Sequence, residues 1–313
     1  MHAYLTEINS NFTTEYGSVK VAMPNINFFL KKIENKEHFH FLRMNHGFFD
    51  RSAIAAEHIL GNSLSTFSNS KEHAKSMTLT KSLSYPGKKW FGSVKDLLYE
   101  QSTLAFLNDV KIKDIDNFYI AVSDSFGFGW DQVGKRNNTG WPSTYVQMKS
   151  VLNLDSNKPY MHGGLFRHYS VKNELNDFFE FFKHDKYHFI VVGPNYYKGY
   201  RPYFGKTFTH IEINSTNAIN DIISIKKKCK DSIKPNLHNV ILVSLEIGCY
   251  PISRFFRIEK ELNATIIDIG RALDYLIKDQ IKQPWLEENL VDLWSSRVDS
   301  MRNKLSIISE TKL

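Results

Sequence analysis

A crowded polar stretch follows an apolar run near residue 40. The segment FHFLRMNHGFFD, residues 39–50, leads from apolar side chains into Arg43, Asn45, His46, Gly47 and Asp50. A guanidinium at the end of a buried strand needs an anion, and phosphate matches its planar fork. His46 and Asp50 are four residues apart, so on a helix they would share a face and hold a metal or move a proton. A capping Asp and a His bonded to the backbone are the alternatives for this pair.

Three later apolar runs also end in residues that suit a ligand site. They end at Gly193 before Pro194, at Gly248, and at Asp268. In open parallel sheets, ligands bind beyond the carboxyl ends of the strands, where backbone N–H groups are available. Each residue also has a structural explanation: a chain turn, a close approach of strand and helix, and a helix cap.

Two segments combine cations with aromatic residues. The stretch 124–169 contains Asp124 and Arg167, for which we favour roles in a ligand pocket. The loop YYKGYRPYFGK, residues 196–206, follows an apolar run, and an acceptor or a nucleic acid would suit it. An aromatic-packed turn is the alternative. The candidate acceptor-binding residues of this loop are Lys198, Arg201 and Lys206.

Short apolar runs alternate with longer amphipathic segments. Uninterrupted apolar strands are normally covered on both faces, so the pattern predicts an α/β sandwich with a largely parallel sheet and helices on both faces. The expected strands are 39–44, 118–123, 189–193, 210–214, 239–245 and 264–270. The expected helices are 51–61, 95–108, 170–184, 216–230, 251–262 and 271–282.

The length of 313 residues fits one large domain, 1–313. Within it we expect irregular insertions at 62–94 and 124–169 and a C-terminal helical segment at 285–308. No signal peptide and no transmembrane stretch are recognisable, so we expect a soluble, cytoplasmic protein, which the two cysteines also fit. The formal net charge of +7 favours polyanionic partners such as DNA or an anionic membrane surface, although solubility explains it equally well.

Five segments in order along the chain resemble the GT-D glycosyltransferases, a family first described as a domain of unknown function. FLRMNHG resembles an early strand ending in Arg-x-Gly-Asp-Gly-Glu, and IAVSDSF resembles an Ile-Pro-Asp-x-Phe region. YMHGGLFRHYS resembles a Tyr-rich segment ending in Ser-Arg-Pro-Tyr. VILVSLEIG resembles a late strand ending in Leu-Gly-Pro, and IIDIGRALDYL resembles Ile-Asp-Ile-Gly followed by acidic residues. The resemblance implies a Rossmann-like fold and transfer of a sugar from a nucleotide sugar, such as a UDP-sugar.

The resemblance also implies roles for single residues. Arg43 would lie near the diphosphate, and Asp124 and Arg167 would lie in the donor pocket. Gly248 and Asp268 would lie in the rim near the nucleotide. Apart from the resemblance, the places of Asn45, Gly47 and Gly193 after apolar runs make them further candidates for donor binding. The Asp-Gly-Glu of the family, which resembles a motif for a divalent metal, falls on His46-Gly47-Phe48, so metal dependence is left open. Asp50 would replace one ligand, or arginines would neutralise the diphosphate without metal.

We therefore expect a glycosyltransferase in which His46, Asp50 or Asp124 takes part in catalysis. The acceptor would be a hydroxymethylated base in DNA or, alternatively, a cell-surface glycan or a glycoprotein. A non-catalytic nucleic-acid-binding protein on the same scaffold is the alternative of a different class. We expect Arg43→Ala to lower turnover severely without unfolding the protein.

Overall fold

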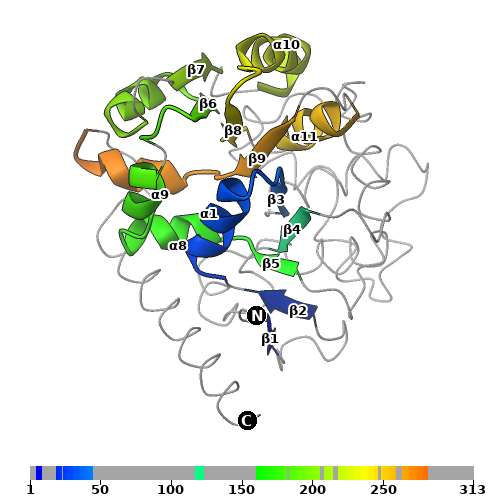
Figure 1. Ribbon diagram of the computed structural model, residues 1–313, viewed down its shortest axis with the longest axis vertical. Helices are drawn as coiled ribbons and strands as arrows, with labels where there is room; N and C mark the ends of the chain where they lie inside the picture. Colours follow the sequence, from blue (N-terminus) through cyan, green and yellow to red (C-terminus); the bar gives the residue numbers. More distant parts are fainter. Residues whose placement is uncertain are drawn as a thin grey trace, which may run out of the picture.

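A nine-stranded sheet runs through the computed structural model of the chain (Figure 1). The order of the strands is β1-β2-β5-β4-β3-β9-β8-β6-β7. The structure describes residues 5–8, 19–22, 24–44, 117–122, 160–181, 183–204, 208–213, 218–245, 248–258 and 263–280. The strands are β1 (Leu5–Ile8), β2 (Val19–Ala22), β3 (His40–Met44), β4 (Phe118–Val122), β5 (Tyr160–His162), β6 (Tyr187–Gly193), β7 (Phe208–Glu212), β8 (His238–Val243) and β9 (Ala264–Asp268).

Every strand pair of the sheet is parallel except β1 with β2, which lie antiparallel at one end of the sheet. From β3 the chain continues to β4 and β5 on one side, whereas β6 to β9 lie on the other side and β9 pairs with β3. The winding therefore changes direction between β3 and β9. In open α/β sheets, ligands bind outside the carboxyl ends of the strands at such a point.

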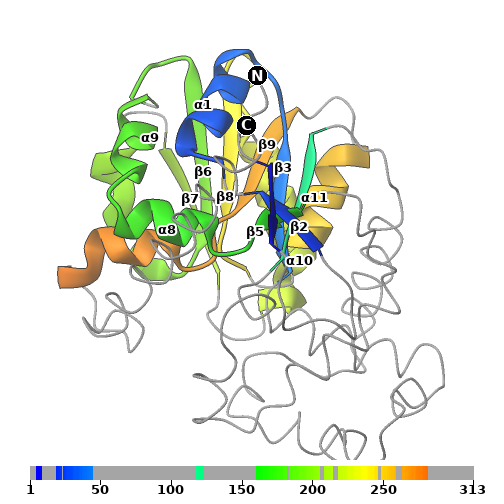
Figure 2. The ribbon, with the colours of Figure 1, turned by 90° about the horizontal axis from the view of Figure 1, so that it is seen from below.

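Helices cover both faces of the sheet (Figure 2). On one face lie α1 (Ile26–Glu34), α8 (Leu165–Val171) and α9 (Leu175–Phe181), and on the other lie α10 (Ile222–Ser232) and α11 (Cys249–Ile258). The 3-10 helices are η5 (Asn195–Tyr203), η6 (Ala218–Asp221) and η8 (Ala272–Gln280). The α/β class with a mostly parallel sheet is confirmed. None of the helices in the described part of the chain is long and apolar enough to cross a bilayer.

Aromatic side chains fill the core beneath α1 and α8. In α1, Ile26, Phe29, Leu30 and Ile33 recur at the spacing of one helical face and are buried. The Phe29 ring lies 5.2 Å from the ring of Phe166 on α8, centroid to centroid. These residues form helices because one face of each can be buried against strands that are apolar on both sides.

The structure corrects several expected boundaries. The segment expected as one helix at 170–184 is divided into α8 and α9, and Asn173, with φ of 60°, lies between them. The helix expected at 271–282 is the 3-10 helix η8, with non-helical angles at Ile277. The insertion expected at 124–169 contains β5 and the start of α8. The segments 62–94 and 285–308 lie outside the described residues, so the single-domain organisation stays a prediction.

Histidines gather at the amino ends of β3 and β8. The ring of His38 stacks on that of His238 with centroids 4.4 Å apart, and His40 Nδ1 lies 2.7 Å from Ser253 Oγ on α11. Burial, reinforced by Arg257 and His38, lowers the pKa of His40 to about 3. Burial, together with His38, lowers the pKa of His238 to about 4. These histidines are therefore neutral in the folded protein at neutral pH.

The buried histidines predict a loss of stability in weak acid. The pKa values of these histidines in the folded state lie below the ordinary 6.5. The free energy of unfolding is therefore highest above pH 6.5 and decreases as the pH falls below it. For His40 we expect a loss of about 2 kcal/mol in the free energy of unfolding between pH 6.5 and about pH 5. Urea unfolding across this range measures it. His40→Gln should flatten the dependence and exposed His184→Gln should not; an equal slope in all three proteins would contradict the prediction.

Candidate functional site

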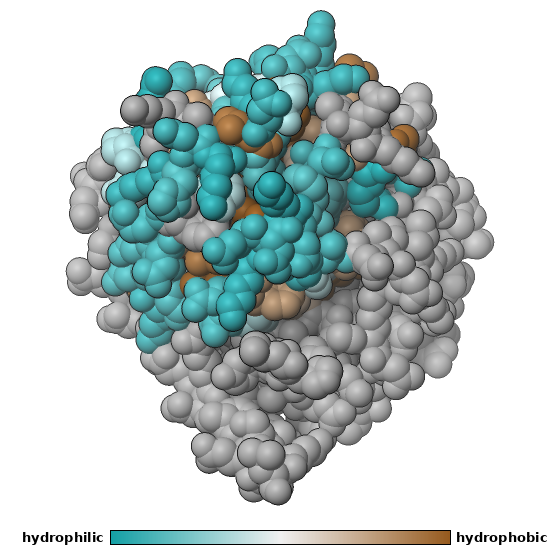
Figure 3. All heavy atoms as spheres, in the orientation of Figure 1, coloured by the Kyte–Doolittle hydropathy of each residue, from teal (hydrophilic) through white to brown (hydrophobic). Residues whose placement is uncertain are grey.

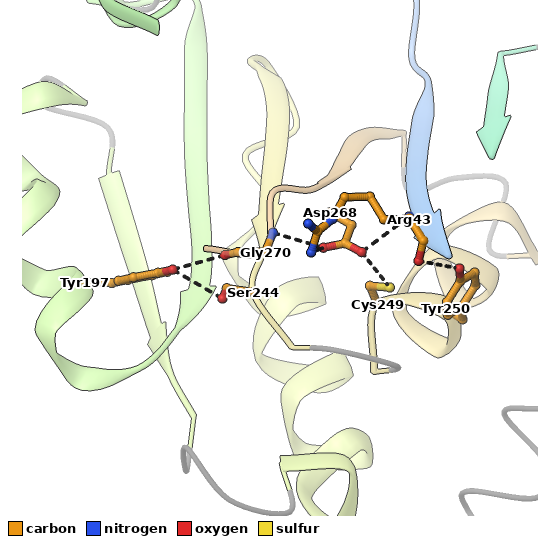
Figure 4. A network of polar contacts seen from close by, with 7 residues as sticks. All are labelled: Arg43, Tyr197, Ser244, Cys249, Tyr250, Asp268 and Gly270. Carbon is orange, nitrogen blue, oxygen red and sulfur yellow. Dashed lines mark hydrogen bonds and ion pairs between the residues drawn. The ribbon is translucent and has the colours of Figure 1, made fainter. Parts of the chain in front are cut away.

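An ion pair joins the carboxyl ends of the two strands between which the winding changes direction. Arg43 lies near the end of β3 and Asp268 ends β9, and the Nη2 of Arg43 lies 3.1 Å from the Oδ1 of Asp268 (Figure 4). The Asp268 carboxylate is fully buried and also accepts from the backbone N–H of Gly270 at 3.1 Å and from the Cys249 thiol at 3.5 Å. The hydroxyl of Tyr250 donates to the carbonyl oxygen of Arg43 at 2.7 Å. The pair therefore ties β3, β9 and α11 together.

The anion beside Arg43 is thus a carboxylate of the protein. Burial opposes the charge of the guanidinium, but the attraction of Asp268 outweighs it, so the pKa of Arg43 lies above its ordinary value. The side chain is 17% exposed, and its Nε finds no partner among the described residues. Asp268 is therefore an anion of the kind that the guanidinium at the end of this strand needs. Direct contact of Arg43 with a diphosphate stays a prediction.

The absence of a side chain at Gly270 leaves room for the Arg43 guanidinium. The φ of Gly270 is +50°, and a Cβ there would lie 1.9 Å from the Nη2 of Arg43. Glycine adopts this backbone conformation without the steric cost that a side chain incurs. A side chain at this position would displace the Arg43 guanidinium, so glycine is required here.

Tyr197 connects the residue after β8 to the turn at Gly270. Its hydroxyl lies 3.2 Å from both the carbonyl oxygen of Gly270 and the Oγ of Ser244, which follows β8 (Figure 4). Burial raises the pKa of Tyr197 well above its usual value, so the phenol is neutral. A Cβ on Gly193 would lie 2.2 Å from the Tyr197 ring. Close packing against this ring therefore accounts for Gly193, whose contact with a donor stays a prediction.

A second charged cluster lies beside this turn. The Nη1 of Arg271 donates to the hydroxyl of Tyr196 at 2.5 Å and lies 3.9 Å from the Oδ2 of Asp274. The Tyr196 hydroxyl in turn lies 3.3 Å from the same carboxylate oxygen, and Asp274 is fully buried. Burial, with the added effect of Asp274, raises the pKa of Tyr196 to about 12. The Arg271 side chain is 30% exposed, so it is held in place while still reaching the surface.

Arg167 is brought to the same region. It lies on α8 with its guanidinium carbon 5.5 Å from the ring centroid of Tyr275, the residue after Asp274. The helices α8 and η8 are in contact over this stretch. The structure thus places Arg167 beside Tyr275, which follows the buried Asp274 in the sequence. Its predicted role in a donor pocket is compatible with this place but is not tested by it.

Of the residues predicted to form a binding loop after β6, some are buried and others are exposed. Tyr197 and Tyr200 are buried, so an aromatic-packed turn describes this part of η5. Lys198 and Arg201 are exposed, and the Nζ of Lys198 lies 2.8 Å from the Oε2 of Glu212 on β7. Acceptor binding by these residues stays a prediction.

Packing also explains Gly248, because a Cβ there would lie 2.5 Å from the Leu245 side chain. Its donor-binding role therefore stays a prediction. The other predicted site residues lie outside the described residues: Asn45, His46, Gly47, Asp50, Asp124 and Lys206. Within the described residues, no three His, Cys, Asp or Glu side chains are placed to hold a metal ion.

The buried cysteines are thiols and not nucleophiles. Burial, together with Asp268, raises the pKa of Cys249 well above its usual value, and burial raises that of Cys229 to about 12. A thiolate is the reactive form of cysteine, so neither side chain is suited to covalent catalysis. Six residues that the structure places at the carboxyl edge were not predicted from the sequence: Tyr196, Ser244, Cys249, Tyr250, Arg271 and Asp274. The turn after Ile-Asp-Ile-Gly was the one signal for Arg271.

Comparison with known proteins supports the fold. No family model matches the chain, and no curated protein matches it. A solved structure described as a new glycosyltransferase (DUF1792) from Streptococcus sanguinis matches with a TM-score of 0.50 at 14% identity, over 83% of this chain and 85% of that one. A second, described as the highly conserved domain of unknown function 1792 with a distinct glycosyltransferase fold, matches with a TM-score of 0.46 at 15% identity, over 81% of this chain and 82% of that one.

The first of these likenesses covers most of both chains. At 14% identity it bears on the fold, which agrees with the mostly parallel sheet and the two helical layers described above. The resemblance seen in the sequence is thus confirmed at the level of architecture. The chain therefore has an α/β fold similar to that of the solved structure from Streptococcus sanguinis that is described as a new glycosyltransferase (DUF1792).

Proposed function

We propose that the protein is a glycosyltransferase that moves a sugar from a nucleotide sugar to an acceptor hydroxyl. The observation that carries the proposal is the cluster of cations at the carboxyl edge, beside the change of winding between β3 and β9, on a glycosyltransferase fold. This is the edge at which α/β sheets bind nucleotides. The cations are Arg271, held by Tyr196 and Asp274, and Arg167, stacked on Tyr275.

The chemistry requires charge to be stabilised on the leaving group. The bond between the anomeric carbon and the diphosphate oxygen breaks, a new bond forms to the acceptor oxygen, and the acceptor proton passes to a base. Negative charge grows on the departing nucleoside diphosphate, and positioned guanidinium groups stabilise it most in the transition state. We assign this task to Arg271 and Arg167, and the base to His46 or Asp50, as the sequence analysis suggested.

For the donor we propose a UDP-sugar, and for the acceptor a hydroxymethylated base in DNA. The overall charge of +7 and exposed Arg201 on η5 support an anionic acceptor. Transfer to DNA should weaken steeply as salt rises, whereas transfer to a neutral glycan should change little. Equal rates in low and high salt would therefore contradict the DNA acceptor and leave the enzyme class intact.

The experiment that tests the proposed function uses the full chain and a panel of UDP-, GDP- and CMP-sugars. Release of the free nucleotide is measured with and without added acceptor, and with and without a chelator. We expect slow release from one donor without acceptor, because water can replace the acceptor hydroxyl. A protein that binds none of these nucleotides by calorimetry and releases none of them would contradict the proposal.

A further inference from the structure

The outer face of one helical layer carries a concentrated positive charge. The helix α10 contains four lysines, at 226, 227, 228 and 230, against one acidic residue, Asp231. On the opposite layer, α1, α8 and α9 together carry three Lys or Arg and three Asp or Glu side chains. The excess of cations is therefore local to the α10 side of the described structure. A charge run that served only solubility would not need this asymmetry.

Hydrophobic side chains lie among these cations. Ile223 on α10 and Ile258 on α11 are each 64% exposed, and among the described residues they are the large hydrophobic side chains that are mostly exposed. Ile223 shares a face of α10 with Lys226, Lys227 and Lys230, which follow it by three, four and seven residues. Favourable interaction with the helix dipole would explain Lys230 in the last turn but not the other two lysines.

The two helices form one surface. The Nζ of Lys226 lies 5.8 Å from the ring centroid of Phe255 on α11, a half-buried residue one turn before Ile258. Both helices cover the same face of the sheet (Figures 1 and 2). In Figure 3, hydrophilic side chains cover the upper end of the molecule, where α10 lies, with a few hydrophobic ones between them. We call the residues Ile223, Lys226, Lys227, Lys230, Phe255 and Ile258 the α10–α11 surface.

We propose that the α10–α11 surface docks on a membrane that contains anionic lipids. Lysines beside exposed aliphatic side chains match a headgroup layer, because the ammonium groups meet lipid phosphates while the isoleucines enter the acyl boundary. A nucleic-acid surface would use the same cations but would give the exposed isoleucines no partner, since binding there is dominated by phosphate contacts. The combination therefore favours a lipid surface over nucleic acid. This inference does not rest on the proposed function.

The test is co-sedimentation of the full chain with lipid vesicles. We expect binding to phosphatidylcholine vesicles that contain about one third phosphatidylglycerol, little binding to pure phosphatidylcholine, and loss of binding in high salt. Each lysine near an anionic surface contributes about 1 kcal/mol, so the double variant Lys227→Gln, Lys230→Gln should weaken binding about twenty- to thirtyfold. Ile223→Ser should weaken it about fivefold without a change of charge.

A matched control removes the same charge elsewhere. The double variant Lys31→Gln, Lys36→Gln changes two exposed lysines in and just after α1, on the opposite layer, and should change binding less than about twofold. Failure to bind anionic vesicles, or equal weakening by both double variants, would overturn the proposal. Duplex DNA serves as the competing probe: DNA binding that the Lys227 and Lys230 changes abolish, with vesicle binding untouched, would also overturn it.

Discussion

Replacing Asp268 with alanine should lower the free energy of unfolding by about 3–5 kcal/mol. The substitution leaves the Arg43 guanidinium, only 17% exposed, without the carboxylate that lies 3.1 Å away. It also removes the acceptor for the Gly270 N–H and the Cys249 thiol. Removing one partner of a buried ion pair costs more than removing both, because an uncompensated charge stays behind. Urea denaturation followed by circular dichroism measures the change.

Two comparisons separate the ion pair from a general effect. Asp231→Ala changes an exposed aspartate on α10 and should shift the free energy of unfolding by less than about 0.5 kcal/mol. The double variant Arg43→Met, Asp268→Leu removes both charges and should be more stable than the Asp268→Ala protein. A double variant less stable than Asp268→Ala would show that the pair is not the source of the loss.

The same reasoning changes the expectation for Arg43→Ala. From the sequence alone, this variant is expected to lose turnover and keep its fold. In the structure, however, the substitution removes the cation that pairs with the buried Asp268 carboxylate. A loss of stability should therefore accompany any loss of turnover. The turnover of the Arg43→Ala protein should therefore be divided by the concentration of folded protein before it is compared with the wild type.

Arg271→Ala should lower turnover about a hundred- to a thousandfold if the protein transfers a sugar from a nucleotide donor. Its guanidinium is oriented by the Tyr196 hydroxyl at 2.5 Å and reaches the surface at the carboxyl edge, where the diphosphate would leave. Because charge on the leaving oxygen grows towards the transition state, the fall should appear in kcat more than in KM. Steady-state release of nucleoside diphosphate measures both constants.

Conservative variants test whether orientation matters as well as charge. Arg271→Lys keeps the charge without the planar fork and should recover part of the rate, while Tyr196→Phe removes the hydroxyl that holds the guanidinium and should cost less than Arg271→Ala. Arg254→Ala, a half-buried arginine on α11, is the matched control and should leave donor hydrolysis unchanged. If the wild-type protein releases nucleotide and the Arg271→Ala protein is equally active, the role of Arg271 is contradicted. The proposed enzyme class would not be affected by that result.

The sheet was predictable because of how its strands are covered. Strands such as β6 and β9 are buried along their whole length, so they appear in the sequence as uninterrupted apolar runs. The three-residue strand β5 is too short to show such a pattern, and the sequence analysis placed it in an irregular insertion. The helix α1 was not predicted although its apolar spacing is regular, because it has only nine residues, no side-chain cap hydrogen bond and no acidic residue in its first turn.

The site was predictable only in part, since its contacts join distant segments. Arg43 and Asp268 were each singled out, but their pairing depends on β3 lying next to β9, which no local pattern reveals. Arg271 was missed because an arginine at the start of an amphipathic segment is common on helix surfaces. Its position is held by a hydrogen bond to Tyr196, which is 75 residues away in the chain.

The position of β9 beside β3 has a consequence for synthesis on the ribosome. One edge of β3 pairs with β4. Its other edge pairs with β9, residues 264–268, which is synthesised more than two hundred residues later. Until then the growing chain exposes an unpaired, apolar strand edge, and pairings of such long sequence separation form slowly. The sheet should therefore complete its folding only after residues 264–268 have left the ribosome.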